Sequence, residues 1–440
     1  MMEHPLALKS IPANTLFGEG DVFVLFGEMF GRGYATGLIE AAKAAGMTVI
    51  GMTMGRRDNG GALRPLTDEE LAAAEAGLGG RIINVPLMAG FDMDAAPGEP
   101  TPTDMLGEMT LENWQSFKLD QDRIARAREV GVARFRDAVT RVMAELDGMI
   151  PAGRNVLFAH TMAGGIPRAK VFMAIANRVY KGRGARYMSS QALIDSDLGK
   201  LILQNFDEVT ANSFGHLLEL SGPLRARIEA QGGQVRYTAY GYHGTRVLID
   251  GAYRWQTYTN YTQGYAKMRL EGLARAAWDK GVKAVVFNCP EIRTNSSDVF
   301  AGIELSLLPL LTALRHEGGG AWVDDLWQYC ETLLQDGISV DTVLQMVHDY
   351  QHNPAMQPYY DFASWPKANS ADQVEQTVGT SQDIVNLHKD RKTLVSDVLS
   401  QHVVAATGRL IFGATSAPEA PVLWLDHDIV ARQLIEMHGA

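Results

Sequence analysis

Cysteine is scarce in this 440-residue chain, which holds only Cys289 and Cys330. Two such residues provide neither a disulfide framework nor a zinc-binding pattern, so we expect two buried, reduced thiols. Basic residues are also fewer than acidic ones. The formal net charge of −11 argues against nucleic acid and against an anionic membrane surface as partners.

Long apolar runs and a secretion signal are lacking as well. No stretch of 18 consecutive apolar residues occurs, so we expect no membrane-spanning helix. Glu3 and His4 lie near the N-terminus, and this stretch lacks the basic start and the apolar core of a signal peptide. We therefore expect a cytoplasmic protein. Its 46% hydrophobic content is ample for a sizeable core.

The most informative stretch lies at residues 21–54. A short apolar run at 22–26 indicates a buried strand, a helical pattern covers 34–45, and a second apolar run follows at 47–54. Between the first strand and the helix lie three glycines in the spacing GxxxGxG: Gly27, Gly31 and Gly33. This order of strand, glycine turn, helix and strand predicts the first half of a dinucleotide-binding unit.

The glycines and the start of the helix have a common physical reason. A pyrophosphate binds to the unpaired amides at the beginning of a helix, where the helix dipole also favours an anion. A β-carbon at the turn would obstruct that approach or strain the backbone. We therefore expect Gly27, Gly31 and Gly33 to bind the cofactor.

Arginines near this turn bear on the choice of cofactor. Arg56 and Arg57 follow the second predicted strand, where the adenosine ribose lies in such folds, and Arg32 lies within the glycine turn. An acidic residue at that place binds the ribose 2′-hydroxyl of NAD, whereas arginines suit the 2′-phosphate of NADP. The sequence thus favours NADPH, with NADH as the less favoured cofactor. The alternative is a solvated arginine pair, and Asp58 could bind either arginine.

Apolar runs alternate with helical patterns through the first 320 residues. The further predicted strands lie at 81–88, 155–160, 234–240 and 282–288, and the long helical patterns lie at 111–146 and 198–229. Strands that alternate with helices indicate an α/β fold. We therefore expect a Rossmann-type, doubly wound parallel sheet with large insertions and a helical C-terminal extension.

The expected domain organisation follows from these patterns. One elaborated Rossmann domain covers residues 1–320, with insertions near 89–125 and 166–197. The remaining residues, 321–440, form a mainly helical extension packed on it. Within that extension the sequence predicts a helix at 382–404 and a late strand at 421–425.

Four tyrosines gather near one lysine in residues 253–279, which we expect to form an aromatic-rich loop that enters a helix. These residues are Tyr253, Tyr258, Tyr261, Tyr265 and Lys267. A neighbouring ammonium lowers the pKa of a phenol and can hold a cofactor ribose, so that the phenol can donate a proton to a substrate oxygen. The alternative is a tyrosine cluster that packs a loop.

The order of these motifs resembles the short-chain dehydrogenase/reductase superfamily over residues 20–320. Besides the glycine turn and the tyrosine–lysine pair, the resemblance rests on the small-residue turn at 161–165, on Asn212 within a helix, and on PEIRT at 290–294. PEIRT is similar to the family's P-G-x-I-x-T segment, which contacts the nicotinamide carboxamide, although Glu291 replaces the usual glycine. The resemblance implies cofactor contacts from Ala163, Ile292 and Thr294.

The spacing before Lys267 indicates a branch of this superfamily. The usual Tyr-x3-Lys would need a tyrosine at Gln263, and the Tyr-x6-Lys of the common enoyl-acyl carrier protein reductases would need one at Asn260. Tyr258 fits Tyr-x8-Lys, which is similar to the divergent FabV/trans-2-enoyl-CoA reductase branch. That branch has a second lysine where this chain has Met268.

The resemblance implies roles for four residues. Tyr258 would donate the proton, with Tyr261 as its rival, and Lys267 would position the ribose and the tyrosine. Tyr240, at the end of the fifth strand, resembles the second active-site tyrosine of the common enoyl reductases. No serine stands near Thr238, where the usual catalytic serine would fall. Its loss damages ketone reduction more than enoyl reduction, because in a ketone reductase it polarises the carbonyl.

The sequence thus predicts an NADPH-dependent reductase of the C=C bond of an enoyl thioester or a related enone, as used in fatty acid metabolism. The expected partners are a small-molecule or acyl-thioester substrate and no nucleic acid, and a homo-oligomer is compatible with the chain. No metal is expected. Two alternatives stay open: an NADP-dependent carbonyl reductase or alcohol dehydrogenase, and a cofactor-binding sensor or subunit that has lost catalysis.

Overall fold

A seven-stranded parallel sheet forms the centre of the computed structural model, which describes residues 6–29, 33–58, 61–241, 243–256, 262–294, 297–299, 301–362, 364, 366 and 368–439. The strand order is β5-β2-β1-β6-β7-β10-β11. The strands are β1 Val22–Phe26, β2 Thr48–Thr53, β5 Arg81–Pro86, β6 Val156–His160, β7 Val235–Gly241, β10 Ala284–Asn288 and β11 Val422–Trp424. The predicted doubly wound Rossmann sheet is confirmed.

The central strands are mostly apolar because helices cover both faces of the sheet. Every residue of β1, β6 and β10 is buried. Side chains of β1 alternate between two cores: Phe23 and Leu25 belong to one, and Val22, Val24 and Phe26 to the other. Because Phe26 pairs with His160 and Asn288 pairs with Gly241, the carboxyl ends of these strands are level and their loops meet at one edge.

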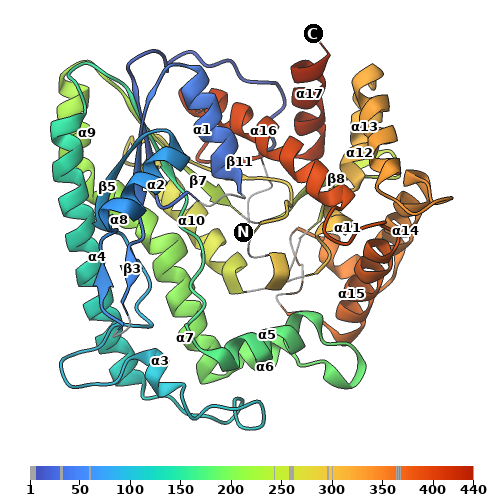
Figure 1. Cartoon of the computed structure of the whole chain (residues 1–440), viewed down its shortest axis with the longest axis horizontal. Helices are drawn as coiled ribbons and strands as arrows, with labels where there is room; N and C mark the ends of the chain where they lie inside the picture. Colours follow the sequence, from blue (N-terminus) through green and yellow to red (C-terminus); the bar gives the residue numbers. More distant parts are fainter. Residues whose placement is uncertain are drawn as a thin grey trace.

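Different helices build the two cores. The first face is covered by α1 Tyr34–Ala44 and α16 Val395–Ser416, with α12 Pro309–His316 and α17 His427–His438 nearby. The second face is covered by α4 Gln121–Met149, α8 Ser213–Leu220, α9 Gly222–Ala230 and α10 Thr262–Trp278. In Figure 1, α4 and α9 lie at one side of the molecule and α13, α14 and α15 at the opposite side.

The remaining elements are short or belong to insertions. They are β3 Arg56–Arg57, β4 Leu63–Arg64, α2 Asp68–Leu78, α3 Pro102–Met105, α5 Lys170–Lys181, η1 Gly184–Arg186, α6 Ser190–Asp195, α7 Asp197–Phe206, η2 Asp207–Asn212, β8 Thr245–Ile249, β9 Ala252–Gln256, η3 Ser297–Val299, α11 Ile303–Leu307, α13 Ala321–Thr332, α14 Val340–His352, η4 Gln357–Tyr360 and α15 Ala371–Asn386. Of these, η2 is a π-helical turn. Among the described residues, no helix is both long enough and apolar enough to cross a bilayer.

The C-terminal residues contribute directly to the sheet. The predicted strand at 421–425 is confirmed as β11, whose Val422 pairs with Val286 of β10. α16 packs so closely on α1 that both helices need glycine at the crossing. A β-carbon on Gly37 would lie 2.0 Å from the Val404 carbonyl oxygen, and one on Gly408 would lie 2.1 Å from the Gly37 carbonyl carbon. The mainly helical extension therefore completes both the sheet and one of its cores.

Three local predictions differ from the structure. The helix predicted from residue 111 begins only at Gln121, because the Asp120 carboxylate accepts the Arg123 amide and caps it there. The helix predicted at 382–404 is wrong: α15 ends at Asn386 and α16 starts at Val395, with polar, exposed residues between them. Residues 253–256, expected to belong to an aromatic loop, instead form most of β9, which pairs with β8 in a hairpin.

An Asp-Gly turn explains that hairpin. Asp250 and Gly251 join β8 to β9 with φ values of 51° and 72°. Positive φ at both central residues defines the two-residue turn whose twist matches paired strands. Both cysteines are buried and neither forms a disulfide within the described part of the chain, as predicted.

Candidate active site

The glycine turn lies at the point where the strand order reverses. β2 and β5 extend from one side of β1, and β6, β7, β10 and β11 from the other. Ligands of open α/β sheets bind in the crevice outside the carboxyl ends of strands at such a point. Gly27 ends β1 there with φ 142°, and a β-carbon on it would lie only 2.4 Å from Thr161 Oγ1 in the turn after β6. The two turns that border the crevice are therefore in contact.

The start of α1 leaves room for an anion. Gly33 precedes the helix, and a β-carbon on it would meet nothing within 4 Å. Across the crevice, Ala163 is exposed in the turn after β6. Open space above a helix start, next to small residues, fits a dinucleotide pyrophosphate. Gly31 and Arg32, which the sequence also predicts to bind the cofactor, lie outside the described residues.

The turn after β6 packs against the end of α7 and the following π-helical turn η2. A β-carbon on Gly165, at φ 131°, would lie 2.5 Å from Phe206 Cα. The Thr210 hydroxyl donates to the Gly164 carbonyl oxygen at 3.1 Å. These contacts fix the backbone on which Ala163 stands.

Arg56 does not project as a free cation, because it binds Glu28. Its guanidinium donates to both carboxylate oxygens of Glu28, at 2.9 and 3.1 Å, and this pairing raises the pKa of Arg56. The Glu28 side chain also accepts the Met54 amide at 2.9 Å. An acidic residue of the glycine turn thus reaches the end of β2, where the ribose of a dinucleotide lies.

Arg57 is directed into the β3–β4 turn. Its Nη1 donates to the Gly61 carbonyl oxygen at 2.7 Å, and burial lowers its pKa. Asp58 accepts the Ala62 amide at 2.9 Å within the same turn.

Glu28 was not predicted from the sequence to take part in the site. The available signal was an acidic residue directly after Gly27, opposite two arginines that follow the next strand.

Tyr240 and Lys267 meet at the carboxyl end of β7. Lys267, on α10, is only 5% exposed, and its Nζ donates to the Tyr240 carbonyl oxygen at 2.6 Å. Burial lowers the pKa of Lys267 to about 8. We call Lys267, Tyr240, Tyr34 and Cys289 the Lys267 corner. The other two predicted tyrosines, Tyr258 and Tyr261, lie outside the described residues.

The phenol of Tyr240 is buried against Tyr34. The two rings stack with their centroids 5.6 Å apart, and Tyr34 is the first residue of α1, directly after Gly33. Within the described part of the chain, the Tyr240 hydroxyl has no hydrogen-bond partner, and burial raises its pKa well above the usual value. A buried, unpaired hydroxyl is costly, and a bound ligand would relieve that cost.

The PEIRT segment, residues 290–294, follows β10 and borders the Lys267 corner. The Tyr34 hydroxyl donates to the Pro290 carbonyl oxygen, and Ile292 is buried. Thr294 donates its amide to Ser297 Oγ at 2.7 Å. Cys289 is close enough to Lys267 for the two groups to interact electrostatically, while burial raises the pKa of its thiol. Tyr34 was not predicted, because its contacts with β7 and β10 arise only from the folded sheet.

A buried polar network positions α10. Asn288, at the end of β10, donates to Glu271 Oε1 at 2.9 Å and accepts the His243 amide at 2.7 Å. Glu271 lies one helical turn after Lys267. A β-carbon on Gly241 would lie 2.5 Å from Asn288 Oδ1, so this close packing needs glycine. The ends of β7 and β10 thereby hold the helix that carries Lys267.

Asn212 is not part of this corner. Its side chain donates to Glu208 at 2.8 Å, and Glu208 binds Arg128 of α4 at 2.6 Å.

A histidine and a serine are buried together at the end of β6. His160 Nε2 lies 2.8 Å from Ser213 Oγ. Burial, and then the charge of Lys267, lower the pKa of His160.

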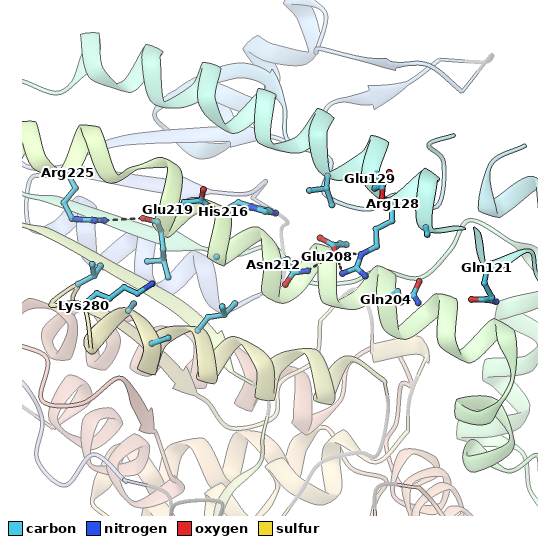
Figure 2. A pocket seen from close by; sticks show the side chains of 18 residues that line it. Gln121, Arg128, Glu129, Gln204, Glu208, Asn212, His216, Glu219, Arg225 and Lys280 are labelled. Carbon is cyan, nitrogen blue, oxygen red and sulfur yellow. Dashed lines mark hydrogen bonds and ion pairs between the residues drawn. The ribbon is translucent and has the colours of Figure 1, made fainter. Parts of the chain in front are cut away.

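A separate cavity of about 950 Å³ lies between α4, α7, η2, α8 and α10. Figure 2 shows Arg128, Glu208 and Asn212 on its wall, with His216 further along. Of the predicted catalytic and cofactor-binding residues that the structure describes, none lines this cavity. We therefore place the candidate active site at the carboxyl edge of the sheet and not in this cavity.

The doubly wound parallel sheet places the chain in the Rossmann-type class, and the comparisons with known proteins show it to be an NAD(P)-dependent oxidoreductase. A family model described as enoyl-acyl carrier protein reductase FabMG matches residues 4–434. The chain therefore belongs to the FabMG family of enoyl-acyl carrier protein reductases. This confirms the predicted membership of a divergent enoyl reductase branch.

Two solved structures are similar over the whole chain. An apo structure of FabMG is 61% identical, covers 100% of both chains and has a TM-score of 0.97. An NADH-bound structure of FabMG is 51% identical, covers 99% of this chain and 100% of its own, and has a TM-score of 0.81. No curated protein matches the chain.

Proposed function

We propose that the protein reduces the C=C bond of an enoyl thioester carried on acyl carrier protein, with NADH as the preferred hydride donor. The observation that carries the proposal is the Lys267 corner, beside the crevice of the glycine turn. There a buried lysine lies next to a buried phenol that has no hydrogen-bond partner among the described residues. Family membership supports the enoyl-acyl carrier protein substrate.

The corner is suited to negative charge. When bound, the nicotinamide cofactor supplies a hydride to the β-carbon of the enoyl group, and negative charge then develops on the thioester oxygen. The Tyr240 hydroxyl would donate a hydrogen bond to that oxygen, and the Lys267 ammonium would stabilise it through space. Both groups act strongly because little water reaches them.

A tyrosine is proposed as the proton donor to the resulting enolate. Tyr258 is the first candidate because of its Tyr-x8-Lys spacing, and Tyr261 is its rival. Lys267 would lower the pKa of the donating phenol and orient it together with the ribose. Tyr258→Phe and Tyr261→Phe, compared in single-turnover reduction, distinguish the two. Full activity in the first variant and loss in the second would assign the role to Tyr261.

Two observations favour NADH over the NADPH that the arginines suggested. Glu28 binds Arg56 through both carboxylate oxygens, so the guanidinium is already neutralised at the ribose end of the crevice. A carboxylate there can accept a hydrogen bond from a 2′-hydroxyl but repels a 2′-phosphate. In addition, the 51% identical FabMG structure is described as bound to NADH.

The cofactor proposal is tested with Glu28→Gln. The wild-type protein is expected to have a higher kcat/KM with NADH than with NADPH. The variant is expected to shift the ratio toward NADPH by about tenfold, because it removes a negative charge and frees Arg56. A wild-type preference for NADPH would overturn this assignment and would support the prediction made from Arg56 and Arg57.

The reaction itself is tested by cofactor oxidation with three substrates: an enoyl-acyl carrier protein, the matching enoyl-CoA, and a simple ketone. Turnover of the enoyl thioesters, with the carrier-protein form preferred, is the expected result. Turnover of the ketone alone would select the carbonyl reductase alternative and refute the proposal.

A further inference from the structure

A cluster of one carboxylate and two imidazoles is formed by residues to which the proposed reaction assigns no part. Asp250 stands in the β8–β9 turn, and His348 and His352 stand on α14. One potential ligand atom from each of the three lies within 4.8 Å of the other two. Among the described residues, no other group of three histidine, cysteine or acidic side chains meets this condition.

The fold presents these residues in a fixed way. His348 and His352 are four residues apart on one helix, so their side chains lie on the same face, and their rings stack with centroids 4.1 Å apart. Asp250 adopts φ 51° in the tight Asp-Gly turn, which directs the hairpin tip toward that face. Two histidines at i and i+4 on a helix form the usual half of a zinc site.

The hydrogen bonds determine which ring nitrogens face the carboxylate. His352 Nδ1 lies 2.8 Å from the His348 carbonyl oxygen, which can only accept, so Nδ1 carries the proton. Its Nε2 then points at Asp250 Oδ2, 2.8 Å away, and His348 Nε2 points at Asp250 Oδ1, 3.2 Å away. In metal sites, a backbone carbonyl that accepts the far N–H of a ligand histidine orients the ring in this manner.

The separations fit a small divalent ion. Zn²⁺ bonds of about 2.0–2.2 Å place tetrahedral ligand atoms roughly 3.3 Å apart. The two nitrogen–oxygen distances, 2.8 and 3.2 Å, are close to that value. All three side chains are between 41% and 49% exposed, so water can complete the coordination. Two imidazoles with one carboxylate favour zinc and similar transition metals over magnesium or calcium.

We propose that Asp250, His348 and His352 bind a divalent transition-metal ion, with Zn²⁺ as the test ion, and that this ion ties the β8–β9 hairpin to α14. The bound ion restrains the hairpin tip from outside. At the other end of the hairpin, Trp255 packs against Phe362 with ring centroids 5.2 Å apart, and the chain continues toward α10. The site therefore stabilises the segment that leads to the catalytic helix without taking part in the reaction.

The experiment uses tag-free protein, because an oligohistidine tag would itself bind zinc. Protein cleared of metal with a chelator is titrated with Zn²⁺ in the presence of a chromophoric competitor. We expect one ion per chain. Asp250→Asn, His348→Asn and His352→Asn should each weaken binding by at least about tenfold, because each removes one of three protein ligands. His316→Asn, at another exposed histidine, is the matched control and should bind as the wild type does.

A second readout locates the ion. Zn²⁺ should slow hydrogen exchange of residues 245–256 in the wild type and in His316→Asn, and should have no such effect in the triple variant of Asp250, His348 and His352. Absence of stoichiometric binding by the wild-type protein would overturn the proposal. Equal Zn²⁺ affinity of the triple variant and the wild type would overturn it too. Neither result depends on enoyl reduction, so the site is judged separately from the proposed reaction.

Discussion

The Lys267 corner and the Asp250–His348–His352 cluster are both small groups of reactive side chains, but they differ in burial. Lys267 is 5% exposed and Tyr240 is 8% exposed, whereas the three cluster residues lie at the surface. Burial lowers the pKa of Lys267 to about 8 and leaves a phenol unpaired within the described structure. At the surface, water screens charge, so only the arrangement of ligand atoms carries information. The role proposed for the Lys267 corner therefore depends on its buried environment. The role proposed for the Asp250–His348–His352 cluster depends on the arrangement of its ligand atoms.

The largest effect is expected at Lys267, where a substitution should lower the activity without lowering the stability. Lys267→Met should reduce kcat/KM for enoyl reduction by roughly 10²- to 10³-fold, because it removes the ammonium that stabilises the developing oxyanion. The free energy of unfolding should stay similar or rise, since a buried charge is replaced by an apolar side chain of similar length. Steady-state kinetics and urea unfolding of the same preparations test both statements.

A parallel fall of activity and stability in Lys267→Met would contradict this reasoning. It would mean that the lysine acts mainly through its 2.6 Å bond to the Tyr240 carbonyl oxygen, as a structural link between α10 and β7. Lys267→Arg is the conservative control, because it keeps the charge but not the compact ammonium.

The second prediction concerns pH. Burial gives Lys267 a folded-state pKa of about 8, below the usual lysine value of 10.5. Between these values the unfolded chain binds more protons than the folded one, so the Lys267 contribution to stability rises with pH in this window and is least favourable below about pH 8. Activity should change in the opposite direction: kcat/KM should fall above about pH 8 as the ammonium is lost. A pH-rate profile of the wild type, flat from pH 8 to 10, would refute the role of the charged lysine.

How much of this could be read from the sequence depends on the range of the contacts. The strand before Gly27, the helix after the glycine turn and the strand at 234–240 are local patterns, and the structure confirms them. The capping box of Thr67 and Glu70 at the start of α2 is also a local feature, formed by residues three positions apart. Such features need only neighbouring residues, so their signal is present in a short stretch of chain.

The contacts that shape the site are not local. Glu28 binds Arg56 across 28 positions, and Tyr34 binds the Pro290 carbonyl oxygen across 256 positions. α16 reaches α1 through Gly37 and Gly408, two glycines that look ordinary in their own segments. No periodicity encodes such pairs, because they depend on how the sheet brings distant segments together. The same is true of Asp250 and the two histidines of α14.

The third prediction sharpens the contrast at Tyr240. Tyr240→Phe should reduce kcat/KM by about 10- to 100-fold, because one donor to the developing oxyanion is lost. The protein without ligand should keep its stability or gain up to about 1 kcal/mol, since the hydroxyl is buried without a partner in the described structure. Thermal unfolding and kinetics provide the two values. Clear destabilisation would show that the hydroxyl has a hydrogen-bond partner in the ligand-free protein and would contradict this reasoning.

The smallest effect is expected at the exposed cluster when metal is removed. His352→Asn should leave the apo melting temperature and the enoyl reductase activity close to those of the wild type, because the side chain is 42% exposed and its ion pair with Asp250 is screened by water. Only addition of Zn²⁺ should separate the two proteins, by raising the melting temperature of the wild type through binding to the folded state alone. Thermal melts with chelator and with Zn²⁺ check this. If His352→Asn lowered the melting temperature in chelator as much as in zinc, the cluster would act as an ion-pair network, and the contrast between an environment-dependent site and a geometry-dependent one would fail.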